Sequence, residues 1–472
     1  MISKKFILAS FLLCLLAFII PIEHKYDKLF RYFSLTLIPS GIELSPIFDK
    51  KIYFYVSDFI ALALFLIALA WFRIPLSRFF VKKSTLFLWI IFICSFASIL
   101  VSPFAHYPII YIRLLQLLTP ILLFSFLAHA FEDDQRDKIT RFIFCALIVA
   151  GLMQTAIAIT QYFNQEWLGL RILGEQKLGP GFGISSGNRW IIDSFTGRIA
   201  PSPLVYRASG TLPHPNVLGG FLTFAILVAY SQIASSSKKW RLLIGFTLPF
   251  QFFALSVTYS RAAIFACLLG TLVWFSLIIW NKGLKEIITN SALRFLTFMI
   301  CFSVMINGIL LFEQFAKRGG IVNYNGVAQN SDRVRIHYQN VAFQMIGKNP
   351  LLGVGFHQFS LRYPDYLPKN NDSDIYLTAT HNIYLLLGSE TGLISLGAFF
   401  LFIGTLLRAG MRASITPATA SLIAVFAAYL FIGCCDFYPI LFQQGKLMFF
   451  CAAGLLAAHG HYEKKKLAIY TQ

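Results

Sequence analysis

Two stretches, NSDRVRIHYQNVAFQMIGKNP (residues 330–350) and HNIYLLLGSETGLIS (residues 381–395), decide how this chain is organised. In the first, apolar residues recur at helical spacing, whereas arginines and amides lie off that stripe. The stripe consists of Val334, Tyr338, Val341, Ala342, Met345 and Ile346. An initial Ser-Asp pair and a terminal GKNP predict an amphipathic helix over 331–347. Beside the apolar run that follows His381, such a helix is typical of a segment lying along a membrane surface.

The composition supports a membrane protein. Of the 472 residues, 57% are hydrophobic, only 13% are charged and 49 are phenylalanine. A soluble surface of this size could not cover so many apolar side chains. The sequence therefore predicts an all-α polytopic membrane protein that forms a single integral membrane domain over residues 1–472. All cysteines fall in or beside apolar runs, which argues against a disulfide framework and against a cysteine metal site.

Twelve apolar runs predict about twelve transmembrane helices, because each is near the ~20 residues that cross a bilayer. The runs centre on residues 6–20, 54–72, 86–101, 109–130, 139–162, 217–233, 242–257, 262–280, 295–312, 382–407, 418–435 and 441–458. No small-residue cleavage site follows the first run, so we interpret it as a retained span and not as a secretory signal.

The basic residues test this count. With the N-terminus in the cytoplasm, 20 of the 40 Lys and Arg residues fall in short cytoplasmic connections, whereas the short outer connections carry almost none. This positive-inside pattern predicts a multi-pass protein with both termini in the cytoplasm. It also accounts for the net charge of +19 without a nucleic-acid partner.

Two long segments fall on the outer side, at residues 164–214 and 313–380. Loops of this length in a compact protein are usually functional or disordered. Their aromatic and glycine-turn content is not that of a flexible linker. We therefore expect an ordered first outer loop, and a larger second outer loop that contains the amphipathic helix 331–347, and we expect both to form the working surface.

Polar residues gather where three spans begin on this outer face. They form the clusters RASGTLPHPN (207–216), TYSR (258–261) and HN (381–382). Because all three spans run inward from the outer side, topology alone puts the clusters at one membrane depth. Arg207 and Arg261 cannot lose their charge, and His381 is ionisable near neutral pH. This combination suits a site that grips a diphosphate and takes a proton from a hydroxyl.

Structural explanations compete with this interpretation. An arginine at the end of a span can simply reach the lipid headgroups, and a histidine at a helix start can be a local polar contact. His214, followed by Pro215, has the position of an N-cap for the sixth span. Arg335 and its polar neighbours could form the solvated face of the surface helix.

Two further cations need an explanation of their own. Arg113 and Lys446 lie within apolar runs, where an isolated charge is costly. Each should therefore face a polar cavity or a partner, and Asp58 and Asp436 are possible acidic partners.

A family resemblance rests on four motifs in order. They are Arg207 through His214-Pro-Asn216, then Tyr259-Ser-Arg261-Ala-Ala, then Arg335-xx-Tyr338 through NPLLGVGF to Phe359, and finally His381-Asn382 through Glu390-Thr-Gly392. Over roughly residues 200–400, this set resembles the O-antigen ligase and polymerase superfamily of bacterial membrane proteins. The ligase branch is associated with a His, then Asn, Ser or Gln, nine residues, Gly, two residues, and Gly, Thr or Tyr. Here His381-Asn382 and Gly392 fit that pattern, and Ser395 stands in its last place.

The resemblance implies a metal-independent, inverting membrane glycosyltransferase that needs no cofactor and lies in the bacterial inner membrane. It would transfer a glycan from an undecaprenyl-diphosphate donor to the hydroxyl of a glycolipid or glycan acceptor, such as lipid A–core, on the extracytoplasmic face. His381 would act as the base, and Arg207 and Arg261 would bind the donor diphosphate and stabilise it as the leaving group. The remaining expected substrate contacts are His214, Asn216, Tyr259, Arg335, Tyr338 and Asn382. Membrane lipid is the other expected partner, because the donor tail would enter along the apolar stripe.

Three alternatives stay open. A polymerase of the same superfamily would transfer the glycan onto another carrier-linked repeat, and a protein O-oligosaccharyltransferase would transfer it to a protein hydroxyl. Both differ from a ligase only in the acceptor. A transporter for the lipid-linked glycan belongs to another class, since it would use the arginines only to hold phosphate and would tolerate the loss of His381.

Overall fold

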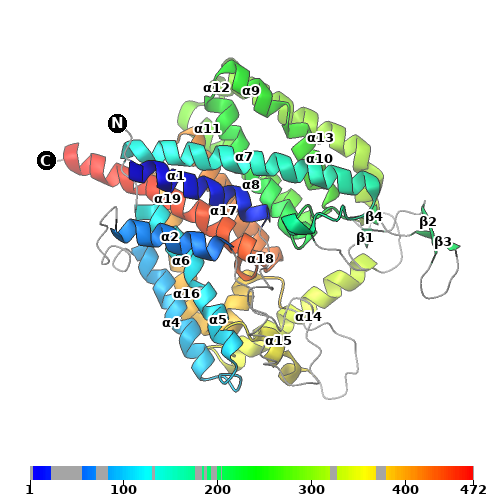
Figure 1. Cartoon of the computed structure of the whole chain (residues 1–472), viewed down its shortest axis with the longest axis vertical. Coiled ribbons are helices and arrows are strands. Elements are labelled where there is room, and N and C mark those ends of the chain that lie inside the picture. Colours follow the sequence, from blue (N-terminus) through cyan, green and yellow to red (C-terminus); the bar gives the residue numbers. More distant parts are fainter. Residues whose placement is uncertain are drawn as a thin grey trace.

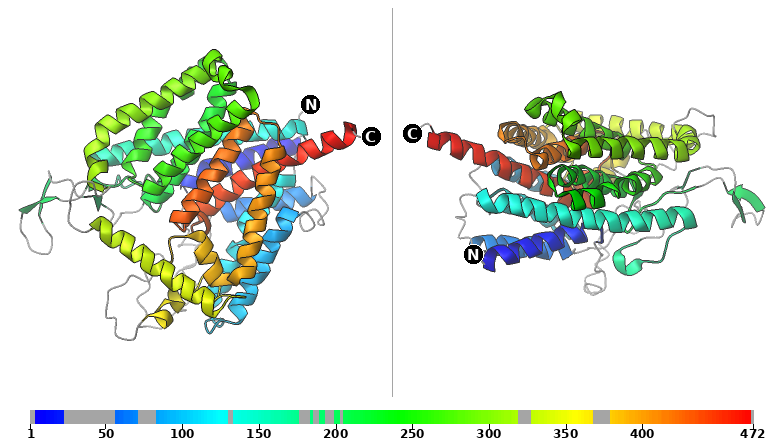
Figure 2. Two further views of the ribbon diagram at one scale, coloured as in Figure 1. Left: turned by 180° about the vertical axis from the view of Figure 1, so that it is seen from behind. Right: turned by 90° about the horizontal axis from the view of Figure 1, so that it is seen from above.

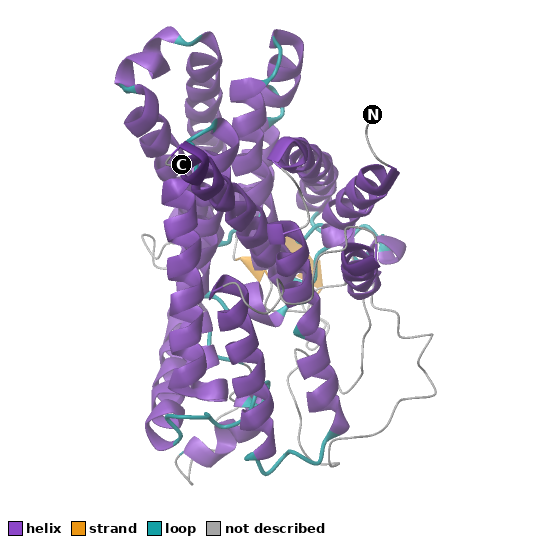
Figure 3. Ribbon diagram, turned by 90° about the vertical axis from the view of Figure 1, so that its left-hand side faces the viewer, coloured by secondary structure: helices purple, strands orange, loops and turns teal. Residues whose placement is uncertain are grey.

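The protein is a bundle of long helices (Figures 1 and 3). The structure, a computed structural model, describes residues 4–22, 56–70, 83–129, 133–175, 183–184, 189–192, 199–202, 205–318, 327–367 and 379–470. Within these residues, nine helices are long and apolar enough to cross a membrane. The predicted all-α polytopic membrane fold is therefore confirmed. Parts of the outer segments 164–214 and 313–380 lie outside the described residues, so their predicted order stays a prediction there.

Each predicted apolar run falls, over its described residues, on one helix or on two consecutive helices. The α-helices are α1 (Lys4–Ile19), α2 (Val56–Ala70), α4 (Lys83–Leu100), α5 (Pro108–Gln116), α6 (Leu118–His129), α7 (Asp133–Asn164), α8 (Pro215–Ser235), α9 (Lys238–Gly245), α10 (Leu248–Val257), α11 (Arg261–Lys282), α12 (Leu284–Thr289), α13 (Ser291–Arg318), α14 (Val327–Lys348), α15 (Phe359–Arg362), α16 (Ile383–Arg412), α17 (Pro417–Cys435), α18 (Tyr438–Leu441) and α19 (Gln443–Tyr470). Short 3-10 turns are η1 (Ile20–Ile22), η3 (Arg171–Leu173) and η4 (Tyr363–Tyr366). Nine of the twelve predicted spans coincide with the long apolar helices of the described chain, and the other three fall on α1, α2 and α19. The count of twelve spans thus stays a prediction.

Two of the predicted spans are interrupted by proline. The span at 109–130 consists of α5 and α6 with a break at Leu117, and the span at 242–257 consists of α9 and α10. Pro120 and Pro249 have no N–H to donate to the carbonyl four residues earlier, so the helical hydrogen-bond ladder is lost at each break. Each pair nevertheless has the length and hydropathy of one span.

Helix α8 is the centre of the bundle, packed against α7, α10, α11 and α17 (Figure 2). In its 18-residue apolar window, 94% of the residues are buried. Two glycines near its start allow this close packing. A Cβ at Gly219 would lie 2.7 Å from Ala263 Cβ, and one at Gly220 would lie 1.9 Å from the Tyr438 hydroxyl oxygen. The first turn of α8 is thereby held against the start of α11 and against α18.

Helix α14 extends to one side of the bundle, with α15 near it (Figure 1), and it packs on α16. It begins at Val327, one turn before the predicted start at Ser331. The residues between Val327 and Ser331 include no glycine or proline that would stop a helix, so the Ser-Asp pair lies inside α14. Of the predicted stripe, Tyr338, Val341, Ala342 and Met345 are buried, but Val334 is 42% exposed.

The quoted motif NPLLGVGF forms a loop that docks into a break in α16. Gly392 has a φ of 83°, and a Cβ there would lie 2.0 Å from the Leu351 carbonyl oxygen. Beside this break, the Glu390 carboxylate accepts the His357 N–H at 2.9 Å and the Phe359 N–H at 3.0 Å. The loop and the break therefore fix how α14 and α15 are held against α16.

Strands are a minor feature of the described chain. In the outer segment before α8, β1 (Gly183–Ile184) pairs antiparallel with β4 (Val205–Tyr206), and β2 (Arg189–Ile192) pairs antiparallel with β3 (Ile199–Ser202). Figure 1 shows β2 and β3 to one side of the helices. The strands lead the chain to Arg207, which follows β4 directly.

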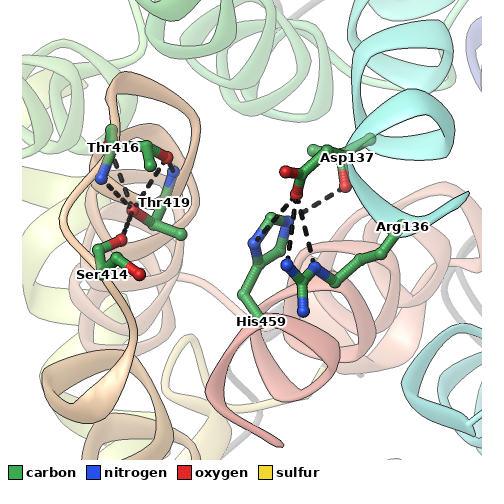
Figure 4. A network of polar contacts seen from close by, with 7 residues as sticks. Arg136, Asp137, Ser414, Thr416, Thr419 and His459 are labelled. Carbon is green, nitrogen blue, oxygen red and sulfur yellow. Dashed lines mark hydrogen bonds and ion pairs between the residues drawn. The ribbon is translucent and has the colours of Figure 1, made fainter. Parts of the chain in front are cut away.

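A cluster of polar side chains joins the start of α7 to the later part of α19 (Figure 4). His459 Nε2 lies 3.1 Å from Thr140 Oγ1, and its Nδ1 lies 3.8 Å from Asp137 Oδ1. Arg136 Nε is 3.4 Å from the same Asp137 oxygen. The neighbouring Thr416 and Thr419 form a capping box that begins α17. This group is far along both helices from the outer-face clusters.

Candidate active site

A chain of hydrogen bonds joins the first polar cluster to the end of α17. Arg207 is buried, and its Nε donates to the Thr258 carbonyl oxygen at 2.9 Å while its Nη2 donates to Asn216 Oδ1 at 2.8 Å. Asn216 Nδ2 in turn donates to Asp436 Oδ2 at 2.7 Å. The Arg207 guanidinium and the Asn216 amide, both from the first cluster, are thus linked to the Thr258 carbonyl and to a buried carboxylate in two other segments of the chain.

Two buried glutamines of α7 fix the segment that carries Arg207. Gln161 Oε1 accepts the Ser209 and Gly210 N–H groups at 3.1 and 2.8 Å, and Gln154 Oε1 accepts the Thr211 N–H at 2.9 Å. Gly210 has a φ of 61°, and a Cβ there would lie 2.2 Å from Gln154 Oε1. Glycine is required because the turn needs a left-handed residue and a close approach.

His214 caps α8, as the structural explanation of its position predicted. Its Nδ1 accepts the Asn216 N–H at 3.0 Å, and Pro215 occupies the first turn of the helix. The pKa of His214 is lowered to about 3. Burial is the largest cause, and the nearby Arg207 also contributes. His214 is therefore a neutral, fixed imidazole at the site.

The second cluster forms the tight turn between α10 and α11. Tyr259 is fully buried and adopts a φ of 51°, and the following Ser260 is the N-cap of α11. This turn presents the Thr258 carbonyl oxygen to Arg207, so the first and second clusters are in direct contact. Arg261 is the first residue of α11, and its side chain is exposed. The structure therefore buries Arg207 within the network, whereas Arg261 is exposed.

The third cluster begins α16. Asn382 is its N-cap, with Oδ1 accepting the Tyr384 and Leu385 N–H groups at 2.9 and 3.0 Å. Asn382 Nδ2 also donates to the Cys434 carbonyl oxygen at 3.2 Å, which ties α16 to the end of α17. The His381 ring packs edge-on against Phe437, with 4.7 Å between the ring centroids. Its Nδ1 is buried and has no hydrogen-bond partner among the described residues.

Electrostatics show that the clusters converge. His214 is close enough to four charged or ionisable side chains for each to act on its pKa; they are Arg207, Asp436, His381 and Arg335. The pKa of His381 is lowered mainly by burial and also by Arg335, whereas Asp436 opposes that shift. Asp436 and Arg335 therefore act on both histidines, and His214 is also near Arg207, so side chains of the first and third clusters lie close together.

Arg335 and Tyr338 reach the site region from α14 in different ways. Arg335 is half-buried and acts electrostatically on both His214 and His381. Tyr338 is fully buried in a cluster with Tyr363, at 5.3 Å between ring centroids, and burial raises its pKa to about 12. The structure thus places Arg335 beside the imidazoles and Tyr338 in the packing beneath α14.

Asp436 is the site residue that the sequence analysis did not select for this role. It is 4% exposed at the C-terminal end of α17, and its Oδ1 accepts the Phe437 N–H at 2.8 Å. The selection considered only residues where spans begin on the outer face. The sequence did offer a signal for Asp436, because this carboxylate directly follows an apolar run that is predicted to end on the same face.

Arg113 and Lys446 face a small polar cavity, as predicted. This cavity of about 40 Å³ is also lined by His357 and Glu390. Burial, with smaller contributions from Arg113 and Lys446, lowers the pKa of His357 to about 3. Of the two acidic partners considered, Asp58 accepts hydrogen bonds from the side chains of Thr119 and Gln443, and Asp436 accepts one from Asn216.

Comparison with known families agrees with the motifs. A family model described as O-antigen ligase matches residues 245–400, which contain the TYSR turn, α14 and the start of α16. No curated protein matches the chain. The matched region carries Arg261, Arg335 and His381, and it packs against the segment that carries Arg207. Residues 245–400 of the chain are therefore similar to the O-antigen ligase family, as the motifs indicate.

Proposed function

We propose that this protein transfers a glycan from an undecaprenyl-diphosphate donor to a hydroxyl of a lipid A–core acceptor on the extracytoplasmic face of the bacterial inner membrane. The observation that carries the proposal is the gathering of His381, Arg335 and Asp436 around the Arg207–Asn216 pair. Cations that hold a diphosphate beside a neutral imidazole are what this reaction requires.

The arginines stabilise the leaving group. As the bond from the anomeric carbon of the glycan to the diphosphate oxygen breaks, negative charge grows on the diphosphate. The Thr258 carbonyl oxygen and Asn216 Oδ1 hold the Arg207 guanidinium in place, so this cationic group is preorganised at the site. Arg261 is exposed at the start of α11 and can meet a diphosphate arriving from the membrane surface. No metal ion is invoked in this step.

His381 takes the proton. The acceptor hydroxyl oxygen forms the new bond to the anomeric carbon from the side opposite to the diphosphate, which inverts that centre, and its proton moves to His381 Nδ1. Burial lowers the pKa of His381, so the imidazole is neutral at the start of the reaction. Asp436 favours the imidazolium that forms, because a nearby carboxylate raises that pKa.

The function can be tested in cells that lack the protein. A ligase predicts bare lipid A–core on a gel of surface glycolipid, together with accumulated long carrier-linked chains in the same extract. Core that bears a single repeat would identify a polymerase instead. An unchanged glycolipid profile, with restored expression as the control, would contradict transfer to lipid A–core.

The pH dependence follows from the environment of His381. Because a base must be neutral, turnover should be lost as the pH falls through the pKa of His381, which lies below the ordinary value of 6.5. Turnover of reconstituted protein should therefore be flat above that value. Arg335→Gln should move the acid limb to higher pH, since Arg335 lowers the pKa, and Asp436→Asn should move it to lower pH. An acid limb above 6.5 that neither substitution moves would contradict the base role.

A further inference from the structure

A polar cleft runs along the side of α14 that faces η4. Its volume is about 400 Å³, within the range of ligand pockets. The residues that line it are His337, Asn340, Val341, Gln344, Lys348, Asp365, Tyr366 and Leu367. The α14 members recur every three or four residues, so they form one stripe of the helix. Arg335 is two residues before this stripe and therefore points to a different face.

The wall formed by η4 is held firmly in place. Asn349 Nδ2 donates to the Tyr366 hydroxyl at 2.9 Å, and the Lys348 ammonium lies 4.8 Å from the centre of the Tyr366 ring. Arg362 Nε is 3.1 Å from Asp365 Oδ2. A site with fixed walls binds without a large ordering cost.

The chemistry of the lining suits a neutral ligand that has many hydroxyl groups. The exposed amides of Asn340 and Gln344 each offer donors and an acceptor, as vicinal hydroxyls require. Lys348 and Asp365 carry opposite charges, so the lining does not favour a phosphate. Tyr366 and Leu367 add apolar surface for the C–H face of a sugar ring.

His337 supplies an independent sign of a missing ligand. Its Nε2 is buried, and in the described chain it has no hydrogen-bond partner. Buried polar atoms without a partner are rare in folded proteins. The His337 ring is fixed by Tyr363, with 5.9 Å between ring centroids, so the atom cannot easily turn away. His337 also lines the cleft, so a ligand bound there would lie beside its ring.

We propose that this cleft is a carbohydrate subsite that binds sugar units of a substrate away from the bond that reacts. It extends the proposed transfer function and rests on it. A helix rises about 1.5 Å per residue, so the stripe from His337 to Lys348 lies about 3 to 20 Å along α14 from Arg335. A glycan with its reacting end at His381 would pass Arg335 and turn around α14 to reach the cleft. The bound sugars belong either to the donor or to the acceptor.

The test uses full-length protein in liposomes and the double variant Asn340→Ala/Gln344→Ala. Both side chains are exposed, so the variant should fold. With carrier-linked glycan purified from cells lacking the protein, and with lipid A–core, we expect the KM for one substrate to rise about tenfold with kcat retained. A rise in the donor KM assigns the sugars to the donor, and a rise in the acceptor KM assigns them to the acceptor. Unchanged KM values for both substrates would overturn the subsite.

Two further measurements separate this proposal from the proposed function. Phe343→Ala is the matched control, because Phe343 is 59% exposed on α14 and does not line the cleft, and it should leave both KM values unchanged. Binding of free glycan, released from the carrier by mild acid, should weaken about tenfold in the double variant. If wild-type protein binds this glycan through the cleft but transfers nothing, the subsite stands and the proposed function fails. If transfer proceeds and the double variant equals wild type, only the subsite fails.

Discussion

Replacing His381 with alanine should lower kcat for glycan transfer by about 10²–10⁴-fold, the usual contribution of a general base. The reason is that His381 Nδ1 is the buried nitrogen, without a hydrogen-bond partner in the described residues, that lies beside both Asp436 and Arg335. Donor binding should be retained, because the arginines that hold the diphosphate stay in place. Turnover and donor binding would be measured separately on protein reconstituted in liposomes.

The His381 experiment has a matched histidine control. His106 is an exposed histidine in the connection between α4 and α5, where it contacts Tyr107 at 4.1 Å between ring centroids. His106→Ala should leave turnover unchanged. Full transferase activity of purified His381→Ala would show that the base role is wrong. A transporter would show no transferase activity in either protein and would keep its transport activity in the His381 variant, so the experiment also separates the two classes.

Much of the fold was predictable because bilayer thickness imposes one length on every span. The apolar runs therefore fell on helices, and α8 was among them. The helix breaks at Leu117 and before Leu248 were not predicted, although the sequence contains Pro120 and Pro249. The spans were assigned from hydropathy alone, and hydropathy does not detect a helix break at a proline. The early start of α14 was missed for a related reason, since a Ser-Asp pair can cap a helix or lie inside one.

For the site, the sequence could predict the depth of each polar cluster in the membrane. His214, Ser260 and Asn382 each cap a helix that starts on the predicted outer face, and residues beside the caps therefore lie at a similar membrane depth. The positions of the caps do not indicate which helices pack against one another. The hydrogen bond from Asn216 to Asp436 joins residues 220 positions apart. The hydrogen bond from the Gly210 N–H to Gln161 joins the loop before α8 to α7. Both depend on which helices are neighbours, which a single sequence does not display.

Arg207→Ala should reduce kcat by about 10²–10³-fold, because removing one preorganised group that stabilises developing negative charge has an effect of this size. Arg207→Lys should recover only part of the activity. A lysine keeps the charge, but its ammonium cannot reproduce the planar arrangement that donates to both Thr258 and Asn216.

Thermal stability must be measured with these variants, because Arg207 also helps to hold Asn216 against the buried Asp436. Arg207→Ala is therefore expected to melt at a lower temperature than wild type. Arg261→Ala supplies the comparison, since its exposed side chain allows replacement with little effect on melting. If both arginines act on the leaving diphosphate, both variants should lose kcat, whereas only the Arg207 variant should lose stability. Loss of stability in Arg207→Ala with wild-type kcat would assign it a purely structural role and leave Arg261 and Arg335 to hold the diphosphate.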